Sequence, residues 1–314
     1  MPVLPHASAT AVRRLAVASV VANCGIVVTG GAVRLTGSGL GCPTWPRCTG
    51  QSYVPTQALA WHGLVEFGNR MLTFALSAVV LVTFLAAIRS RPRRRPLVGL
   101  SLAGLLGIPA QAVLGGITVL TGLNPWTVAA HFALSMALVA VSTVLWHRAA
   151  GAADTPARPV VRPELVRLAQ ALVAVTALTL AVGAVVTGSG PHAGDRHAVR
   201  TGFDPAVVSQ LHADVVMLLV GLSVATWVAL RATGAPAGIG RAAALLVGVE
   251  LGQGAIGYTQ YFTGLPSLLV GFHLLGACLV WVAALRLLLL TRVRVAAAVP
   301  TPADSVDRVA VPVS

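Results

Sequence analysis

The sequence predicts an all-α integral membrane protein whose eight transmembrane helices form two pseudo-symmetric four-helix bundles, with both termini in the cytoplasm. This prediction rests on the composition, on eight long apolar runs and on the distribution of arginine. Of the 314 residues, 56% are hydrophobic and 10% are charged, whereas about 25% are charged in a typical soluble protein. The mean hydropathy is +0.83. A soluble globular domain is therefore excluded, and so is a disordered chain, which needs low hydrophobicity and high charge.

Eight apolar runs are long enough to cross a bilayer, which takes about 20 residues. They span residues 15–32, 62–88, 97–120, 126–146, 165–187, 206–230, 242–262 and 267–290. The first run follows Arg13 and Arg14, as a signal peptide would. No small-residue cleavage site followed by a soluble domain comes after it, so we interpret it as the first transmembrane helix.

Arginine supplies all 22 positive side chains, and the net charge is +13. Most arginines precede the first run or follow an even-numbered run: Arg13, Arg14, Arg89, Arg91, Arg93, Arg94, Arg95, Arg148, Arg158, Arg162, Arg167, Arg231, Arg241, Arg292 and Arg294. The two longer loops on the opposite side, 33–61 and 189–205, hold only Arg34, Arg47, Arg196 and Arg200. By the positive-inside rule both termini are cytoplasmic. The charge is thus an orientation signal, and no nucleic-acid partner is expected.

This topology divides the chain into five segments. They are a cytoplasmic N-terminus at 1–14, an N-terminal four-helix half at 15–149, a cytoplasmic linker at 150–164, a C-terminal four-helix half at 165–291 and a disordered cytoplasmic tail at 292–314.

Internal matches indicate that the second half repeats the first. Thr-Gly-Ser-Gly occurs at 36–39 and 187–190, an offset of 151 residues, and Thr-Gly-Leu occurs at 121–123 and 263–265, an offset of 142. His131 and His273 share the offset of 142, and Gly-Gly-Ile at 115–117 matches Gly-Ala-Ile at 254–256 with an offset of 139. An even number of spans returns the chain to its starting side, so the copies are parallel. Cofactors bind in the interior of such bundles.

Four histidines lie near the outer ends of the even-numbered helices: His62, His131, His212 and His273. Imidazole pairs from facing helices are the usual axial ligands of a membrane haem. Taken singly, each histidine could instead be a polar residue at a helix contact. Zinc is less favoured, because no Cys or carboxylate completes a tetrahedral set near either pair.

Three carboxylates lie within the predicted spans, where they are costly and usually functional. Glu66 lies one turn from His62 and has no acidic counterpart in the second half, which indicates chemistry in one half; the alternative is an ion pair with Arg70. Asp214 is expected to face a neighbouring helix or an arginine. The offset of 139 aligns Glu250 with Gln111.

The four cysteines divide by location. Cys24 and Cys278 lie within spans and are interpreted as packing residues. Cys42 and Cys48 lie in the first outer loop, where either a structural disulfide or a redox-active pair is consistent with an oxidising side.

Several motifs together resemble the haem A synthase family over residues 12–292. They are Thr-Gly-Ser-Gly-Leu-Gly-Cys-Pro-Thr-Trp-Pro-Arg-Cys at 36–48, Glu-Phe-Gly-Asn-Arg at 66–70 and Val-Thr-Gly-Ser-Gly-Pro-His-Ala-Gly-Asp at 186–195. The resemblance implies oxidation of the C8 methyl of haem O to a formyl group, with water as the oxygen source, giving haem A for a terminal oxidase. It implies haem B as cofactor on His212 and His273, and substrate haem on His131.

Two further roles are implied by the same resemblance. Glu66 matches the essential acid of the family, and Cys42 with Cys48 matches its outer-loop disulfide. Arg34, one of the few arginines on the outer side, is a candidate to bind haem propionates.

The chain departs from the family at one position. Many members have His three residues after the glutamate, as the second ligand of the substrate haem, whereas this chain has Asn69. Asn69 precedes His212 by 143 residues and His62 precedes it by 150, so Asn69 occupies the ligand register. His62 lies seven residues earlier on the same face, about 10.5 Å along the helix. Either His62 replaces the missing ligand or His131 holds the haem alone.

The resemblance also implies partners: haem O as substrate, haem O synthase upstream and a membrane electron acceptor such as a quinone, at the bacterial plasma membrane. A homo-oligomer is left open. The alternative function is a di-haem b-type, quinone-linked membrane electron carrier, and a haem-transfer or assembly protein ranks third.

Overall fold

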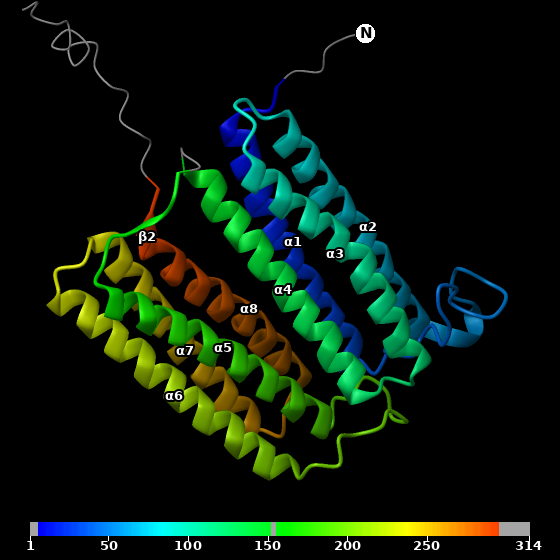
Figure 1. Ribbon diagram of the computed structural model, residues 1–314. Helices are drawn as coiled ribbons and strands as arrows, with labels where there is room; N and C mark the ends of the chain where they lie inside the picture. The colour runs from blue at the N-terminus through cyan, green and yellow to red at the C-terminus, as the bar shows by residue number, and fades with distance from the viewer. Residues whose placement is uncertain (1–5, 152–154, 295–314) are drawn as a thin grey trace, which may run out of the picture.

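The computed structural model describes residues 6–151 and 155–294, and long helices dominate them (Figure 1). The α-helices are α1 Ala9–Leu35, α2 Ala60–Arg89, α3 Arg95–Leu120, α4 Pro125–Ala150, α5 Pro163–Ser189, α6 Pro205–Ala232, α7 Ala237–Phe262 and α8 Ser267–Leu290. A 3₁₀ turn, η1 Gln57–Leu59, precedes α2. Each of the eight helices is long and apolar enough to cross a membrane, which confirms the eight predicted spans.

Most helices extend beyond the apolar runs that predicted them. The first run covers 15–32, whereas α1 begins at Ala9, because the Ser8 side chain accepts a hydrogen bond from the N–H of Ala11 and caps the helix. Asp204 caps α6 in the same way, accepting from the N–H of Ala206 at 2.7 Å. Capping satisfies the free N–H groups of a first turn, and hydropathy does not register it.

Helices α1 to α4 form a closed ring: each packs on the next, and α1 packs on α4. Helices α5 to α8 form a second ring of the same kind (Figure 1). In each ring the two even-numbered helices are therefore separated by the odd-numbered ones. Helix α2 lies diagonally across from α4, and α6 lies diagonally across from α8.

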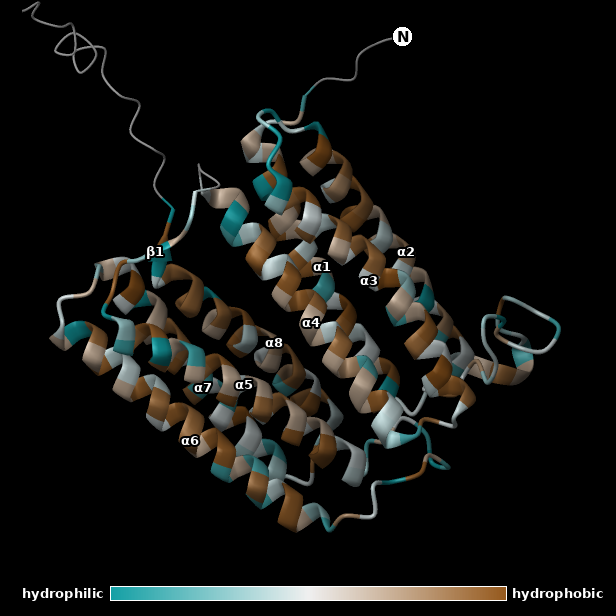
Figure 2. Cartoon of the chain, viewed as in Figure 1, coloured by the Kyte–Doolittle hydropathy of each residue, from teal (hydrophilic) through white to brown (hydrophobic). Residues whose placement is uncertain are grey.

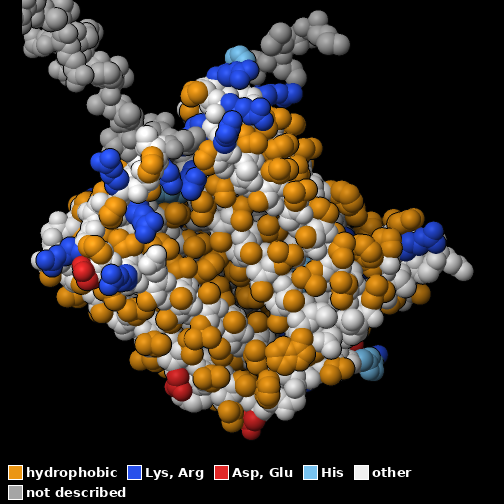
Figure 3. Space-filling view, viewed as in Figure 1, with side chains coloured by type: hydrophobic (Ala, Val, Ile, Leu, Met, Phe, Trp, Pro, Cys, Tyr) orange, Lys and Arg blue, Asp and Glu red, His pale blue; other side chains and the backbone are white. Residues whose placement is uncertain are grey.

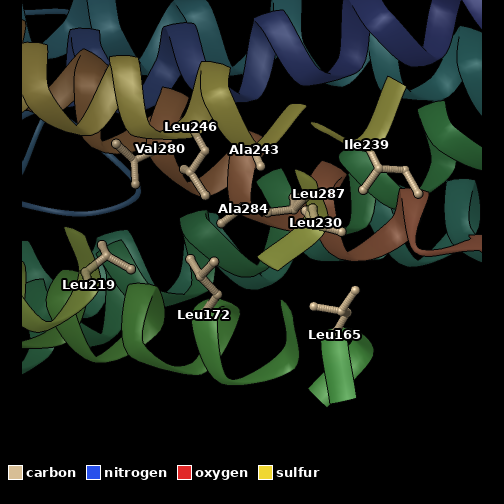
Figure 4. Packing of buried hydrophobic residues seen from close by; sticks show 10 residues of the cluster. All are labelled: Leu165, Leu172, Leu219, Leu230, Ile239, Ala243, Leu246, Val280, Ala284 and Leu287. Carbon is tan, nitrogen blue, oxygen red and sulfur yellow. The ribbon is translucent and has the colours of Figure 1, made fainter. Parts of the chain in front are cut away.

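The two rings meet along α1, α4, α5 and α8. Trp281 on α8 donates its indole N–H to the carbonyl of Met136 on α4 at 2.9 Å, and both belong to one buried cluster with Val27 and Cys278. Cys24 packs against the same cluster, so both cysteines lie at this junction. The second ring has its own apolar core of ten residues, shown in Figure 4: Leu165, Leu172, Leu219, Leu230, Ile239, Ala243, Leu246, Val280, Ala284 and Leu287.

The outer surface is apolar in the middle and polar at its ends (Figure 2). Large apolar side chains such as Phe74 and Leu218 are more than half exposed, as expected for contact with lipid. Arginines gather at the end of the molecule that holds the α2–α3 and α4–α5 connections (Figure 3). We call this the arginine-rich end, and the opposite end, with loops 36–56 and 190–204, the loop end.

Two short strands join the predicted linker to the start of the predicted tail. Strand β1 Arg158–Pro159 pairs antiparallel with β2 Arg292–Val293 at the arginine-rich end. The rest of the predicted tail, from residue 295, and linker residues 152–154 lie outside the described residues.

The repeated Thr-Gly-Leu has the same conformation in both halves. Gly122 and Leu123 have φ values of 63° and 59°, and Gly264 and Leu265 have φ values of 77° and 60°. In each copy the leucine N–H donates to the carbonyl five residues earlier, at 2.8 and 2.7 Å. The glycine accommodates the left-handed conformation that ends the helix, so the sequence match reflects a structural repeat.

Candidate functional site

Three histidines share an unusual environment. Within the described chain, His131 on α4, His212 on α6 and His273 on α8 are the histidines whose Nδ1 is buried without a hydrogen-bond partner. A buried polar atom without a partner costs roughly 1–3 kcal/mol and therefore calls for an explanation. An imidazole that binds a metal through its other nitrogen fits this arrangement.

A glycine faces each of these three rings from the neighbouring odd-numbered helix. A Cβ placed on Gly115 of α3 would lie 3.1 Å from Cε1 of His131. A Cβ on Gly183 of α5 would lie 3.1 Å from Cε1 of His212, and one on Gly257 of α7 would lie 3.3 Å from Cε1 of His273. The absence of a side chain at each glycine makes room for the ring beside it, so these positions form a cradle that fits axial ligands of a haem.

His212 and His273 lie on the diagonal helices of the second ring and are close enough to interact electrostatically. Their placement across the bundle interior is what two ligands of one iron require.

Glutamines fix the histidine-bearing helices in both halves. Gln111 donates to the carbonyl of His131 at 3.3 Å, and Gln253 donates to the carbonyl of His273. Gln111 and Gln253 are 142 residues apart, as are Gly115 and Gly257. The offset of 139 used for this helix is therefore wrong, and the counterpart of Gln111 is Gln253 rather than Glu250.

Asn69 on α2 has surroundings like those of His212. A Cβ on Gly30 of α1 would lie 3.9 Å from Nδ2 of Asn69, so a glycine of the preceding helix again faces the side chain. Thr29 donates its hydroxyl to Oδ1 of Asn69 at 2.8 Å. These contacts agree with the register that placed Asn69 opposite His131.

His62 has different contacts. Its Nδ1 is 2.9 Å from Oγ of Ser38, and its ring stacks on Trp61 with centroids 4.1 Å apart. Its backbone carbonyl abuts Gly41, where a Cβ would lie 2.2 Å from the oxygen. The contacts of His62 are therefore with the loop end, and none of them is with His131.

Glu66 forms the ion pair with Arg70 that we considered as the alternative to a catalytic role. Oε1 accepts from Nη2 of Arg70 at 2.6 Å, and Oε2 accepts from the N–H of Cys42 at 2.6 Å. Arg70 also donates to the carbonyls of Cys42 and Thr44, both at 3.1 Å. Glu66 is only 6% exposed. This pair thus fastens the cysteine loop to α2.

The disulfide between Cys42 and Cys48 is present. Its loop also reaches α3, because a Cβ on Gly116 would lie 2.5 Å from Cδ2 of Trp45. Gly116 adjoins Gly115, the residue that faces His131. Sequence reasoning missed this role of Trp45, although a tryptophan between two prolines in a short loop was an available signal.

Arg34 connects the two outer loops. Its Nη2 donates to the carbonyl of Thr187 at 2.9 Å and its Nε donates to the carbonyl of His192, both in the second half. A cavity of about 240 Å³ beside it is also lined by Arg196 and Arg200. The cationic lining is suited to a carboxylate, and the structure does not test whether a propionate binds there.

The other two predicted intramembrane carboxylates differ from Glu66. Asp214 is exposed and accepts from Nε2 of Gln210 on its own helix at 2.8 Å, so the expected contact with an arginine or a neighbouring helix is wrong. Glu250 is 4% exposed and accepts from the Ser223 hydroxyl at 2.8 Å.

Comparison with known proteins adds an independent finding. The family described as cytochrome oxidase assembly protein, COX15-CtaA, matches residues 13–194, more than half of the chain. This region includes Glu66, Asn69 and His131 but ends before His212 and His273.

Several curated proteins are similar to this chain over a shorter region. The heme A synthase of Alkalihalophilus pseudofirmus is 31% identical over 140 residues, 42% of this chain and 46% of that protein. The heme A synthases of Listeria welshimeri and Geobacillus kaustophilus are 37% and 33% identical over 113 and 107 residues, covering 35% and 34% of this chain and 37% and 32% of those proteins. The chain therefore spans about half, or less, of the length of the curated relatives it matches.

Proposed function

This chain belongs to the COX15-CtaA family of cytochrome oxidase assembly proteins, and on that premise we propose that it is a haem A synthase. The proposed reaction oxidises the C8 methyl of haem O to the formyl group of haem A. The observation that carries the proposal is the set of three buried, unpartnered imidazole nitrogens, each faced by a glycine, in two rings of helices.

The reaction balances as a four-electron oxidation. A methyl group and one water give a formyl group, four protons and four electrons. The electrons require an acceptor, for which we propose a membrane electron acceptor such as a quinone. Haem O synthase is the proposed source of the substrate.

In the C-terminal half, His212 and His273 would hold the resident cofactor, proposed to be haem B. That group supplies one-electron redox chemistry when bound. The chain contributes the two ligands, the glycines that admit their rings and the Gln253 hydrogen bond that holds α7 against the His273 carbonyl.

In the N-terminal half, His131 would bind the iron of the substrate. Glu66 and Asn69 are three residues apart on α2 and so share a face. This places the proposed base one turn from the residue that lies opposite His131. To take a proton from the substrate, Glu66 must release one of its two partners, and Arg70, held by loop carbonyls, remains to balance the charge.

We further propose that the arginine-rich end faces the cytoplasm, because cytoplasmic loops carry an excess of arginine. The loop end, with the disulfide, then faces the oxidising side of a bacterial plasma membrane. The two closed rings of helices support a division into an N-terminal substrate half and a C-terminal cofactor half. Arg34 and its cavity are the proposed contact for haem propionates.

The test compares two buried acids. Glu66→Gln and the matched control Glu250→Gln are each expressed with haem O synthase, and haem O and haem A are separated after extraction. Loss of an acid–base group lowers turnover by roughly 10²–10⁴-fold, so Glu66→Gln should accumulate haem O while Glu250→Gln makes haem A as the wild type does. Thiol-labelling of Cys42 and Cys48 checks that the loop is intact. Wild-type conversion by a haem-loaded Glu66→Gln protein would refute the assignment.

The alternative, a di-haem electron carrier, is favoured by the pair His212 and His273 taken alone. It predicts that the pigment extracted from cells that supply haem O is haem B only. Haem A in the extract would exclude it.

A further inference from the structure

We propose that the N-terminal half binds its haem through His131 alone, and that Asn69 is an amide donor beside an open coordination position that takes a water-sized ligand. This inference rests on the proposed function to the extent that the N-terminal half must hold a haem. It assigns Asn69 the role of positioning a small ligand rather than of binding iron.

The internal repeat gives the first step. His131 and His273 correspond in offset, in the glycine that faces the ring and in the glutamine that bonds to the carbonyl. The partner of His273 across the second ring is His212, and the residue in that place in the first ring is Asn69. Each is faced by a glycine of the preceding helix, Gly183 for His212 and Gly30 for Asn69.

The chemistry of the amide gives the second step. Thr29 donates to Oδ1 of Asn69 at 2.8 Å, which engages the only acceptor of the side chain. What remains is the NH₂ group, which carries two donors and no acceptor. Such a group does not bind iron, but it can donate a hydrogen bond to a ligand that does.

The distances agree with a shorter side chain at this place. The nearest atom to a Cβ on Gly30 is Nδ2 of Asn69 at 3.9 Å, whereas the nearest to one on Gly183 is Cε1 of His212 at 3.1 Å. Asn69 therefore does not fill the room that an imidazole fills in the second half. The unfilled room lies on the side where a second ligand would approach.

The nearby side chains that could replace the missing ligand are held elsewhere. His62 is bound to Ser38 and stacked on Trp61, about 10.5 Å along α2 from Asn69. Both oxygens of Glu66 are engaged, one by Arg70 and one by the N–H of Cys42. Gln111 cannot distinguish the halves, because Gln253 has the same place in the second half. The first ring thus offers one strong ligand, and the second ring offers two.

Carbon monoxide is the probe for the open position, because it binds ferrous haem only where a coordination position is free. The full-length protein is purified with both haems loaded, reduced and titrated with carbon monoxide. We expect one carbon monoxide per two haems in the wild type. Asn69→His should abolish this binding and make both haems six-coordinate and low-spin. Asn69→Leu, which keeps the volume and removes the amide, should bind carbon monoxide with a raised C–O stretching frequency, because a hydrogen-bond donor is lost.

Three results would overturn the proposal. Carbon monoxide could fail to bind the wild-type protein although both haems are present, and restoration of binding by His62→Ala would then identify His62 as the ligand. Asn69→His could bind carbon monoxide as the wild type does, or Asn69→Leu could leave the C–O stretch unchanged. Haem A production is measured on the same preparations. A protein that makes haem A but binds no carbon monoxide refutes only this inference, and one that binds it but makes no haem A refutes only the proposed function.

Discussion

The two halves of this molecule have the same framework and different polar residues. In both, a closed ring of four helices carries a glycine opposite a histidine, a glutamine bonded to that histidine's carbonyl and a left-handed Gly-Leu turn. The C-terminal ring has His212 where the N-terminal ring has Asn69. The N-terminal ring alone has the Glu66–Arg70 pair that fastens a disulfide loop. Packing residues were thus retained in both copies, while the ligand set and the loop diverged.

The difference accords with the proposed division of work. A resident cofactor is best held on both faces, whereas a substrate must enter, react and leave. The loops have diverged in the same sense: residues 42–48 cover their own ring between α2 and α3, whereas the α5–α6 loop contacts the first half through Gly194 and through the carbonyls that Arg34 binds.

Removal of the histidine ligands should separate the halves most strongly. His273→Ala should lose the resident haem during purification, and His131→Ala should retain it but fail to bind the substrate haem. Because outer-shell changes alone lower metal affinity roughly 10–100-fold, we expect more than about 100-fold for loss of a ligand. The haem-to-protein ratio after purification measures this. His62→Ala is the control, and a loss of haem as large as that in His131→Ala would contradict the assignment.

Loss of the disulfide should affect the N-terminal half only. Closing a loop of this length stabilises a protein by about 2–3 kcal/mol in the chain-entropy description. Cys42→Ser combined with Cys48→Ser should therefore expose the loop to trypsin at Arg47 and weaken binding of the substrate haem. The absorption spectrum of the C-terminal haem should not change. A change in that spectrum would show that the loop supports both halves.

The glycines that face the ligands should give the smallest and most informative differences. Gly115→Ala and Gly183→Ala each place a Cβ 3.1 Å from a histidine ring, and overpacking of this kind costs typically about 1–3 kcal/mol. Gly30→Ala meets Asn69 at 3.9 Å, an ordinary contact, and should be neutral or stabilising by up to about 1 kcal/mol through helix propensity. Thermal unfolding followed by fluorescence measures the three. Equal destabilisation by Gly30→Ala would mean that Asn69 fills its place as tightly as His212 does.

Much of the site could be predicted from the sequence because its signals are local or repeated. The offset of 143 residues placed Asn69 in the ligand register, and its contacts with Thr29 and Gly30 agree with that placement. The offset of 139 for Gln111 was wrong because a shift of three residues moves a side chain about 4.5 Å along a helix and keeps it on nearly the same face. A sequence match alone does not resolve that difference.

The sequence by itself determined the class of the protein and the number of its spans, because hydropathy over about 20 residues is a property of the segment and not of its neighbours. The tertiary structure decided which scarce polar groups meet: Glu66 with Arg70 and Cys42, Arg34 with the second half, Trp45 with α3 and Thr29 with Asn69. These contacts depend on the rotation of each helix about its axis. That rotation is set by the packing of neighbouring helices, which include glycines that matter only for the side chain opposite them.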